Sequence, residues 1–417
     1  MNVVGMIVEY NPFHNGHLWH LNEAKRISGA QFTIGVMSGN FLQRGEPAIA
    51  DKWSRARMAV QAGADLIIEL PTVFSVRSAQ YFAAGGIQLL SRLGVVNHVC
   101  FGTETPDLSR LTLVANAINK KDVIDMMRQK MKTGQTYAAS LAAALSSESG
   151  VATSLIQTPN NLLAIEYIRA IIAHAPQLRP LPIQRLCANY HDNLVTSTIA
   201  SATAIRAALL ENKTLIPDSI SWKSLPEVCA KQINDLVIMG KAPITLPAFS
   251  NLILAKIRTM YFDELAGLPE VSEGLHHKIS DAVLKATTVQ ELLAYSKSKR
   301  YTLTRLQRII IYALLGITKT TLTQFDQLGP LYARVLAFNH NGRILLKEIT
   351  KQSTVPVITK TSQFLTSKQR QHSTLPPLQA MLAYDIMATD IYVLGSPNYQ
   401  WRAGGQDYQT SPLYIPG

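Results

Sequence analysis

The first 206 residues alternate between short apolar runs and longer segments whose apolar positions recur at the spacing of an amphipathic helix. The apolar runs predict strands, and they cover residues 2–10, 31–39, 64–71, 96–104 and 181–190. Helical patterns separate them, beginning with residues 17–29, 51–63 and 78–94. Strands that alternate with helices in this way form a parallel sheet covered on both faces. We therefore expect an α/β fold that begins with a Rossmann-like domain.

The hydrophobic pattern changes at about residue 215. Amphipathic helix patterns then follow one another to about residue 316, and beyond about residue 330 strand-like and helical patterns are mixed. We expect three regions, which are an α/β domain over residues 1–215, a mainly helical region over 216–325, and a small mixed α/β region over 326–417.

The composition fits a folded protein with several cores. The chain has 417 residues, of which 47% are hydrophobic and 16% charged, and this balance argues against disorder. The longest apolar run, 309–317, is about half as long as a membrane-spanning helix needs to be, and the first residues lack the basic stretch of a secretory signal. Three widely separated cysteines exclude a disulfide scaffold. We therefore expect a cytoplasmic protein without membrane contact.

The charge points to a polyanionic partner. Forty lysines and arginines against twenty-eight acidic residues give a net charge of +12, which favours nucleic acid, although a basic solvated surface is the alternative. Two basic segments, "KSKRYTLTRLQR" (297–308) and "TSKQRQH" (366–372), suit phosphate contacts, with base stacking on Tyr301. The candidate RNA-contacting residues are Lys297, Lys299, Arg300, Arg305, Arg308, Lys368 and Arg370.

A cluster of histidines follows the first predicted strand, in "NPFHNGHLWHL" (11–21). Gly16 lets a ligand approach the backbone closely, and the N-terminus of the helix that begins here suits a phosphate group. His14 and His17 lie one turn apart and can donate to phosphate oxygens. A nucleotide site, a metal site that includes His20, and an ordinary helix start are all compatible with this pattern. The metal site is disfavoured because no cysteine or acidic cluster nearby completes a ligand set.

A second motif, "IASATAIRAALLEN" (199–212), follows the fifth predicted strand. Ser201 and Thr203 are candidates for the N-cap of a helix, and Arg206 lies in its first turn. Two hydroxyls and a guanidinium at a helix start suit the distal phosphates of a triphosphate, although a plain capped helix is the simpler interpretation. Because the carboxyl ends of parallel strands meet at one edge, we expect this motif to lie beside the histidines.

Weaker signals fall at the same predicted edge. Gly102 ends the fourth strand, where it suits either a nucleotide packed against the backbone or a simple turn. Asn160 and Asn161 begin a helix, where one amide acts as a cap and a second can read a nucleotide. On the helix over 51–63, Lys52, Arg55 and Arg57 are expected to form a solvated charged face.

Five segments, taken in order, resemble the bacterial tRNA(Met) cytidine acetate ligase family, in the nucleotidyltransferase superfamily with an H-x-G-H motif. The segments are "GMIVEYNPFHNGHLWHL", "VMSGNFLQRGEPAIADKWSRARMAVQAGADLIIELP", "FGTE", "PNNLLAIEYIRA" and "ASATAIR". The resemblance implies a two-step ligation without acetyl-CoA. ATP and acetate would form acetyl-adenylate and pyrophosphate, and the acetyl group would pass to the wobble cytidine of elongator tRNA(Met), giving N4-acetylcytidine. It also implies that region 1–215 is the catalytic ATP-binding domain and that region 216–325 binds RNA.

The resemblance further implies roles for individual residues. His14 and His17 would stabilise charge on the phosphates in the transition state, while the distal phosphates would contact Ser201, Thr203 and Arg206. The implied ATP site comprises Ile7, Val8, Glu9, Tyr10, Asn11, Pro12, Phe13, His14, Asn15, Gly16, His17, Leu18, Trp19, His20, Gly102, Asn160, Asn161, Arg185 and Leu186. Candidate substrate contacts are Ser38, Asn40, Arg44 and Glu46, the last two alternatively forming a loop-stabilising ion pair. We expect Mg²⁺ to bind through the phosphates, because such sites often hold it with few protein ligands.

Two other functions stay open. A nucleotidyltransferase that acts on a small metabolite shares the H-x-G-H motif, but such enzymes are far shorter, and the long basic second half argues against one. A nucleotide-sensing RNA-binding protein without catalysis is disfavoured by the intact His14, His17 and Arg206. The sequence leaves the oligomeric state open.

Overall fold

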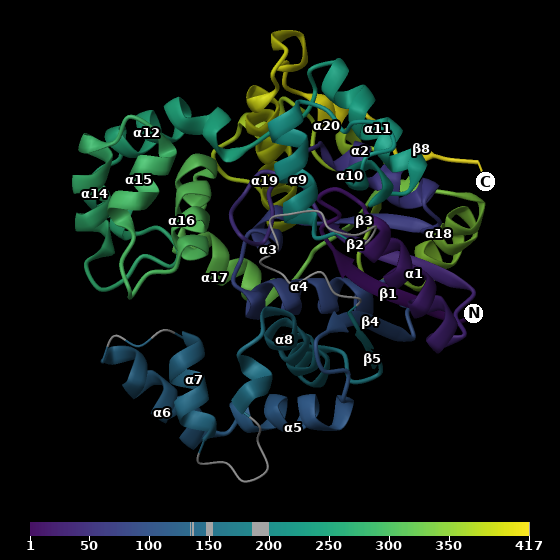
Figure 1. The fold of residues 1–417 in the computed structure, drawn as a ribbon, viewed down its shortest axis with the longest axis horizontal. Helices are drawn as coiled ribbons and strands as arrows, with labels where there is room; N and C mark the ends of the chain where they lie inside the picture. The colour runs from purple at the N-terminus through teal and green to yellow at the C-terminus, as the bar shows by residue number, and fades with distance from the viewer. Residues whose placement is uncertain (134, 136, 147–152, 186–199, 417) are drawn as a thin grey trace.

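The computed structural model describes residues 1–417 except 134, 136, 147–152, 186–199 and 417. At its centre is an eight-stranded sheet with the strand order β5-β4-β1-β2-β3-β6-β7, and β8 also pairs with β6 (Figure 1). The first five strands are β1 (Val3–Val8), β2 (Phe32–Ser38), β3 (Leu66–Leu70), β4 (His98–Thr103) and β5 (Arg179–Gln184). They are mutually parallel, which confirms the predicted α/β fold.

Helices cover both faces of this sheet. One face packs on α1 (Asn15–Ser28) and α2 (Lys52–Gln61), and α11 (Glu227–Ile238) packs against α2. The other face packs on α4 (Ala79–Arg92) and α8 (Pro159–His174). The strands are rich in valine and isoleucine because both of their faces are buried. Helix α4 approaches β1 so closely that a Cβ at Gly86 would lie 2.4 Å from the Ile7 side chain. Glycine at this position therefore allows the helix to pack against the strand.

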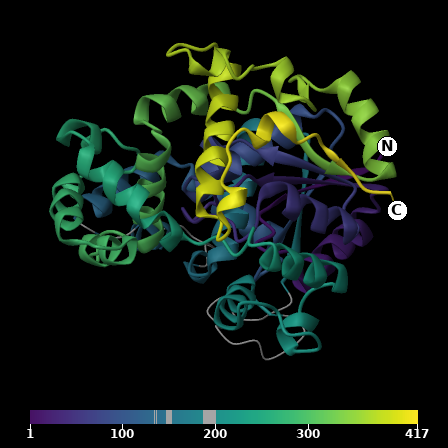
Figure 2. The ribbon, with the colours of Figure 1, turned by 90° about the horizontal axis from the view of Figure 1, so that it is seen from above.

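The mainly helical region forms a lobe beside the sheet, at the left of Figures 1 and 2. Its helices are α12 (Ser250–Thr259), α13 (Phe262–Ala266), α14 (Leu275–Lys285), α15 (Val289–Ser296), α16 (Leu303–Leu315) and α17 (Lys319–Leu328). The apolar run at 309–317 lies in and just after α16, where its residues are almost all buried. Among the described residues, no helix has the length and apolarity required to cross a bilayer.

Further helices surround these two bodies. Between β3 and β5 lie α3 (Thr72–Ser75), α5 (Leu108–Ile118), α6 (Lys121–Lys132) and α7 (Tyr137–Leu145). After β5 come α9 (Ala202–Asn212) and α10 (Ile220–Lys223), and later in the chain α18 (His340–Gln352), α19 (Pro377–Tyr392) and α20 (Gln406–Gln409). Figure 2 shows α19 between the helical lobe and the sheet, where it packs on α3 and α16.

The C-terminal strands extend the first sheet, so residues 326–417 do not form a separate α/β unit. Strand β6 (Ala333–Phe338) pairs antiparallel with β3, and its other edge pairs with β7 (Val357–Ile358) and β8 (Leu413–Tyr414). The hydrophobic pattern predicts a strand in this segment but carries no information about its partner, which lies some 270 positions earlier in the chain. The remaining expected boundaries stay predictions.

Candidate functional site

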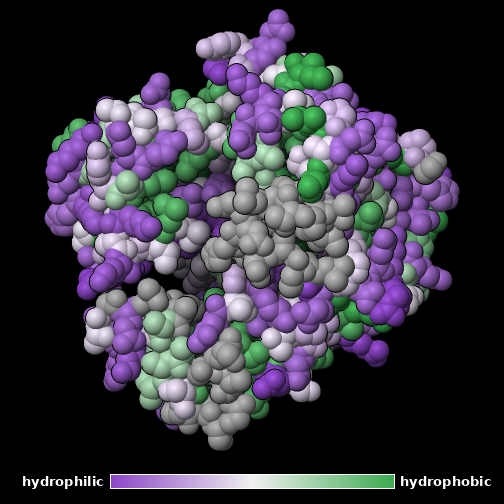
Figure 3. Space-filling view, in the orientation of Figure 1, coloured by the Kyte–Doolittle hydropathy of each residue, from purple (hydrophilic) through white to green (hydrophobic). Residues whose placement is uncertain are grey.

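A cavity of about 420 Å³ opens at the carboxyl ends of β1 and β4, where α1, α8 and α9 begin. It brings together most of the residues expected from the sequence, and these are Ile7, Val8, Glu9, Tyr10, Asn11, His14, Gly16, His17, Trp19, His20, Arg44, Glu46, Gly102, Asn160, Arg185, Ser201, Thr203 and Arg206. On the face drawn in Figure 3, the surface is hollowed between the helical lobe and the body of the protein. The two sequence motifs therefore line one site, as predicted.

The histidine pair lies at the start of α1. The imidazole of His14 caps this helix, because its Nδ1 accepts the backbone N–H of Gly16 at 3.1 Å. Its proton is accordingly assigned to Nε2, which can donate to a ligand. The ring of His17 stacks on that of His14, with centroids 3.7 Å apart. The nitrogen lone pairs of two stacked rings lie in nearly parallel planes, so they cannot both point at one metal ion. The His14–His17 pair is therefore not arranged as a metal site.

Burial keeps these imidazoles neutral. It lowers the pKa of His14 to about 3 and that of His20 to about 4, with the nearby charge of Arg185 acting in the same direction. Burial likewise holds the pKa of His17 well below its ordinary value. The site therefore contributes hydrogen-bond donors near neutral pH without additional positive charge on the rings.

Helix α9 supplies the second half of the site. Ser201 is its N-cap, since the Ser201 Oγ accepts the backbone N–H of Ala204 at 3.1 Å. Arg206 donates from Nη1 to the backbone carbonyl of Asn11 at 2.9 Å and from Nη2 to the Thr203 Oγ1 at 3.3 Å. The guanidinium thus joins the start of α9 to the loop that leads into α1, across nearly 200 positions of the chain.

The two asparagines at the start of α8 have different positions. Asn160 lines the cavity, and its Oδ1 accepts from the Arg185 Nη1 at 2.8 Å. Asn161 is buried and does not line the cavity, because its Oδ1 accepts the backbone N–H groups of Glu104 and Thr105, each at 3.0 Å. The expectation that Asn161 contacts the nucleotide is therefore wrong, and its amide instead orders the loop after β4.

Glu104, a residue of the "FGTE" segment, orders the same helix start. Its carboxylate accepts from the Asn160 Nδ2 at 2.6 Å, from the backbone N–H of Asn161 at 2.7 Å, and from the Thr158 Oγ1 at 3.0 Å. Although burial acts to raise it, these hydrogen bonds hold the pKa of Glu104 below its ordinary value. Nearby, a Cβ at Gly102 would lie 3.0 Å from the Arg185 Cγ. Glycine here leaves room for the Arg185 side chain.

The loop after β2 lines the site only in its second part. Arg44 and Glu46 lie at the cavity, but Ser38 and Asn40 are buried away from it. The side chain of Asn40 accepts the backbone N–H of Lys52 at 2.9 Å and donates to the Thr389 Oγ1 at 3.2 Å. The expectation that Ser38 and Asn40 contact substrate is therefore wrong, because both belong to the interior behind the loop.

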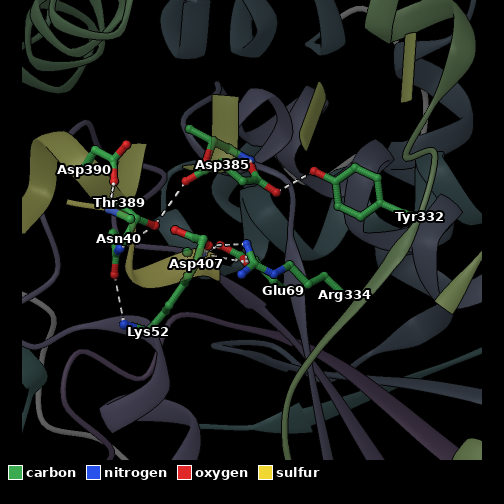
Figure 4. Close-up of polar contacts among 12 residues, drawn as sticks. Asn40, Lys52, Glu69, Tyr332, Arg334, Asp385, Thr389, Asp390 and Asp407 are labelled. Carbon is green, nitrogen blue, oxygen red and sulfur yellow. Dashed lines mark hydrogen bonds and ion pairs between the residues drawn. The ribbon is translucent and has the colours of Figure 1, made fainter. Parts of the chain in front are cut away.

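The expectation of a solvated charged face on α2 is also wrong for two of its three residues. Lys52 and Arg55 are completely buried, and only Arg57 is exposed. The Lys52 Nζ lies 2.8 Å from a carboxylate oxygen of Glu69 and 2.8 Å from one of Asp407 (Figure 4). The guanidinium of Arg55 donates to backbone carbonyls that include those of Ala50, Glu9 and Ser38. These contacts hold together the ends of β1 and β2.

The candidate RNA contacts divide into two groups. Lys297, Lys299, Arg300 and Lys368 are exposed. Arg308 is buried and pairs with Glu270 at 2.6 Å, so the expectation of an RNA contact is wrong for Arg308. Two further expected contacts are engaged within the protein, since Arg305 donates to the Glu270 carbonyl and Arg370 pairs with Asp390 at 2.5 Å. Tyr301, expected to stack on bases, is only 6% exposed.

Other expected ATP contacts lie beside the cavity without lining it. Phe13 is buried and packs against the rings of Tyr10 and His17, and Asn15 donates from Nδ2 to the Lys223 carbonyl. Pro12 and Leu18 do not line the cavity either, and Leu186 lies outside the described residues.

Sequence reasoning missed an apolar wall of the cavity, to which α4, β4 and α8 contribute. Its residues are Phe82, Phe101, Leu162, Leu163 and Tyr167. An apolar position of an amphipathic helix looks the same in a sequence whether it faces the core or a ligand, so no local signal could have identified them.

Comparisons with known proteins agree on one family. The model of the HIGH Nucleotidyl Transferase family matches residues 1–407. The tRNA(Met) cytidine acetate ligases of Acetivibrio thermocellus and Syntrophomonas wolfei are each 37% identical, the first over 98% of both chains and the second over 100% of both. The crystal structure of Thermotoga maritima TmcAL bound with alpha-thio ATP is 30% identical, covers 100% of both chains and superposes with a TM-score of 0.91. The chain therefore belongs to the tRNA(Met) cytidine acetate ligase family of HIGH nucleotidyl transferases.

Proposed function

We propose that this protein activates acetate with ATP and transfers the acetyl group to the wobble cytidine of elongator tRNA(Met), forming N4-acetylcytidine. The observation that carries the proposal is the single cavity in which a neutral histidine pair on α1 faces a capped, arginine-bearing helix start on α9. The names of the relatives and the alpha-thio ATP bound to the Thermotoga maritima structure support the substrates. Region 1–215 would carry the activation step and region 216–325 would contribute to RNA binding.

The first step needs charge stabilisation more than a protein nucleophile. An acetate oxygen would attack the α-phosphorus of ATP, and the bond to pyrophosphate would break. The Nε2–H of His14 and the N–H groups at the start of α1 would donate to the phosphate that gains charge. Arg206 and the hydroxyl groups on α9 would hold the departing pyrophosphate. Because these donors are already oriented in the folded protein, they stabilise the developing charge without the reorientation that water molecules would need.

A magnesium ion would neutralise phosphate charge during this step. Among the described residues, no group of three His, Cys, Asp or Glu side chains is arranged to hold a metal ion. We therefore propose that Mg²⁺ binds mainly through the phosphate oxygens of ATP, as it commonly does when few protein ligands are available.

In the second step the exocyclic amine of cytidine would attack the acetyl carbonyl, AMP would leave, and one proton of the amine would be released. The base must leave its stack to reach an enclosed carbonyl. A cavity of about 420 Å³ is within the usual size range of small-molecule sites, which fits an adenylate with part of a base at its mouth.

The proposal is tested by incubating the protein with labelled acetate, ATP and total tRNA, followed by digestion to nucleosides. Label in N4-acetylcytidine, dependent on ATP and on elongator tRNA(Met), is the expected result. Acetyl-CoA should not replace ATP and acetate. If no nucleoside is labelled while the protein adenylylates a small metabolite, the proposed function is wrong and the alternative nucleotidyltransferase holds.

A further inference from the structure

A platform of aromatic and cationic side chains, one of them exposed and three half-buried, lies outside the cavity, where the loop after α19 meets the end of α11. We call Lys241, Tyr399, Trp401 and Arg402 the aromatic platform. The Arg402 guanidinium lies over the ring of Tyr399, 4.1 Å from its centroid, and the Lys241 Nζ lies 3.7 Å from the centroid of the Trp401 ring. Tyr399 is 79% exposed, so much of its ring is open to a ligand.

The platform is held by contacts between two segments some 160 positions apart. The Trp401 Nε1 donates to the Met239 carbonyl at 3.0 Å, and the backbone N–H of Asn398 donates to the Gly240 carbonyl at 3.0 Å. Gly240 has a φ of +69°, and a Cβ there would lie 2.6 Å from the Asn398 Cβ. The close approach of the two backbones therefore requires glycine, and the aromatic rings are presented on an ordered support.

The platform lies near the cavity. Ile244, three residues after Lys241, donates its backbone N–H to the Ile49 carbonyl at 3.0 Å. The backbone N–H of Ile49 in turn donates to the Oδ1 of Asn11, a cavity residue, at 2.7 Å. Chain dimensions then place the backbone of Lys241 within about 25 Å of Asn11.

The chain on either side of the platform contacts one of the basic segments. Asp390 pairs with Arg370 of the 366–372 segment at 2.5 Å, and its other carboxylate oxygen accepts the backbone N–H of Gly405 at 2.7 Å. The ion pair neutralises the charge of Asp390. It also attaches the 366–372 segment, with its exposed Lys368, to the chain that follows the platform.

We propose that the aromatic platform binds unpaired nucleotides of the tRNA anticodon loop, next to the base that enters the cavity. A nucleotide presents an aromatic base and a phosphate close together, and the platform pairs each ring with a cation within 4.1 Å. Stacking on aromatic rings and phosphate contacts with cations are the two means by which proteins bind single-stranded RNA. The net charge of +12 favours the same partner. The assignment of tRNA as the partner rests on the proposed function.

The test measures binding of an anticodon stem-loop of elongator tRNA(Met), without ATP or acetate. Tyr399→Ala should weaken binding about five- to hundredfold, and Tyr399→Phe should retain it. Tyr414→Ala is the matched control, because Tyr414 is also exposed and has a cation, Arg343, over its ring, but lies on the strand β8 outside the platform and the helical lobe. A blunt RNA duplex of the same length should bind Tyr399→Ala and wild type equally. Arg402→Gln and Lys241→Gln should each reduce the salt dependence by about one unit of slope.

Three results would overturn the assignment. In the first, Tyr399→Ala binds the stem-loop as tightly as wild type. In the second, the wild type shows no affinity for the stem-loop. In the third, Tyr399→Ala abolishes a dimer in light scattering while its RNA affinity stays unchanged. The last result would assign the platform to a second copy of the chain. If the wild type binds the stem-loop through Tyr399 but forms no acetylcytidine, the proposed function fails while the platform stands.

Discussion

Lys52 and Asp407 form an ion pair across 355 positions of the chain, with the Lys52 Nζ 2.8 Å from the Asp407 Oδ1 and neither side chain exposed. Glu69 and Arg334 complete a buried group of two cations and two carboxylates (Figure 4). This group joins α2 and β3 of the first region to β6 and α20 of the last. The charges balance only if the neighbouring carboxyl group, Asp385, is protonated.

Loss of Lys52 should unfold the protein at much lower denaturant concentration. Lys52→Met leaves the buried carboxylates of Glu69 and Asp407 with one cation, and breaking a buried pair in this way costs about 3–5 kcal/mol. Arg57→Ala, on the exposed side of the same helix, should change the free energy of unfolding by less than about 0.5 kcal/mol. Urea unfolding of both variants measures the difference, and equal stabilities would contradict a buried charge network.

Asp385 should make stability depend on pH. Burial, together with the nearby charge of Glu69, raises the pKa of Asp385 to about 7 from an ordinary value of 3.8. The folded state therefore binds more protons than the unfolded state between these values, so this contribution is complete below pH 3.8 and is lost as pH rises through 7. Asp385→Asn imitates the protonated acid and should remove this loss. Melting temperatures at pH 5.5 and 8 should differ less in Asp385→Asn than in wild type, and identical differences would refute the protonated state.

His14→Ala should lower the acetate-dependent exchange of pyrophosphate into ATP by at least about 100-fold, the usual effect of removing a donor that stabilises transition-state charge. Affinity for tRNA should stay close to that of wild type, since the substitution alters only the nucleotide site. His98→Ala is the control, because His98 begins β4 at the end of the strand opposite the cavity and does not line it. A near-normal exchange rate in His14→Ala would remove its assigned role.

Glu104→Ala should raise the KM for ATP by about tenfold. The substitution removes the acceptor that orders Asn160 and the first backbone N–H groups of α8 at the edge of the cavity. Asp107→Ala removes a comparable cap from α5, since Asp107 accepts the backbone N–H of Arg110, but it leaves the cavity intact. Both variants should lose about 1 kcal/mol of stability. If both variants, or neither, show a raised KM, Glu104 does not position the nucleotide.

Reversal of two exposed charges in the helical lobe should weaken tRNA binding. The double variant with Lys299→Glu and Arg300→Glu should reduce the slope of log affinity against log salt by about two, because two cationic contacts are lost. The matched control carries Lys347→Glu and Lys351→Glu on α18, which covers β2 and β3. An unchanged slope in the first variant would exclude the 297–300 segment from the RNA interface.

The site residues that stand in short sequence motifs could be predicted, because such motifs are recognised from neighbouring residues alone. His14, Gly16 and Ser201 stand in short motifs directly after strands, and the rule that parallel strands end at one edge brings such motifs together. The helix start at Asn160 was a weaker local signal, and the resemblance added Arg185; both residues line the cavity.

The long-range parts could not be predicted. Lysine and arginine on a helix are usually solvated, and nothing near Lys52 or Arg308 in the sequence indicates the carboxylates that neutralise them. Glu69 stands in an otherwise apolar strand, which in retrospect is the one local sign that a buried cation lies opposite. The antiparallel pairing of β6 with β3 depends on topology and leaves no trace in either segment.

That pairing has a consequence for synthesis on the ribosome. When the first region has emerged, β3 is an open edge strand, and at about 5–20 residues per second it stays open for roughly 6–25 seconds while residues 216–338 are made. Open apolar edges invite pairing with other chains, and an inward-pointing charge is a known protection against it. Glu69 supplies such a charge while Arg334, the second of its two cationic partners, is still unmade. The residue that helps to bind the finished molecule together can thus also protect the nascent chain from aggregation.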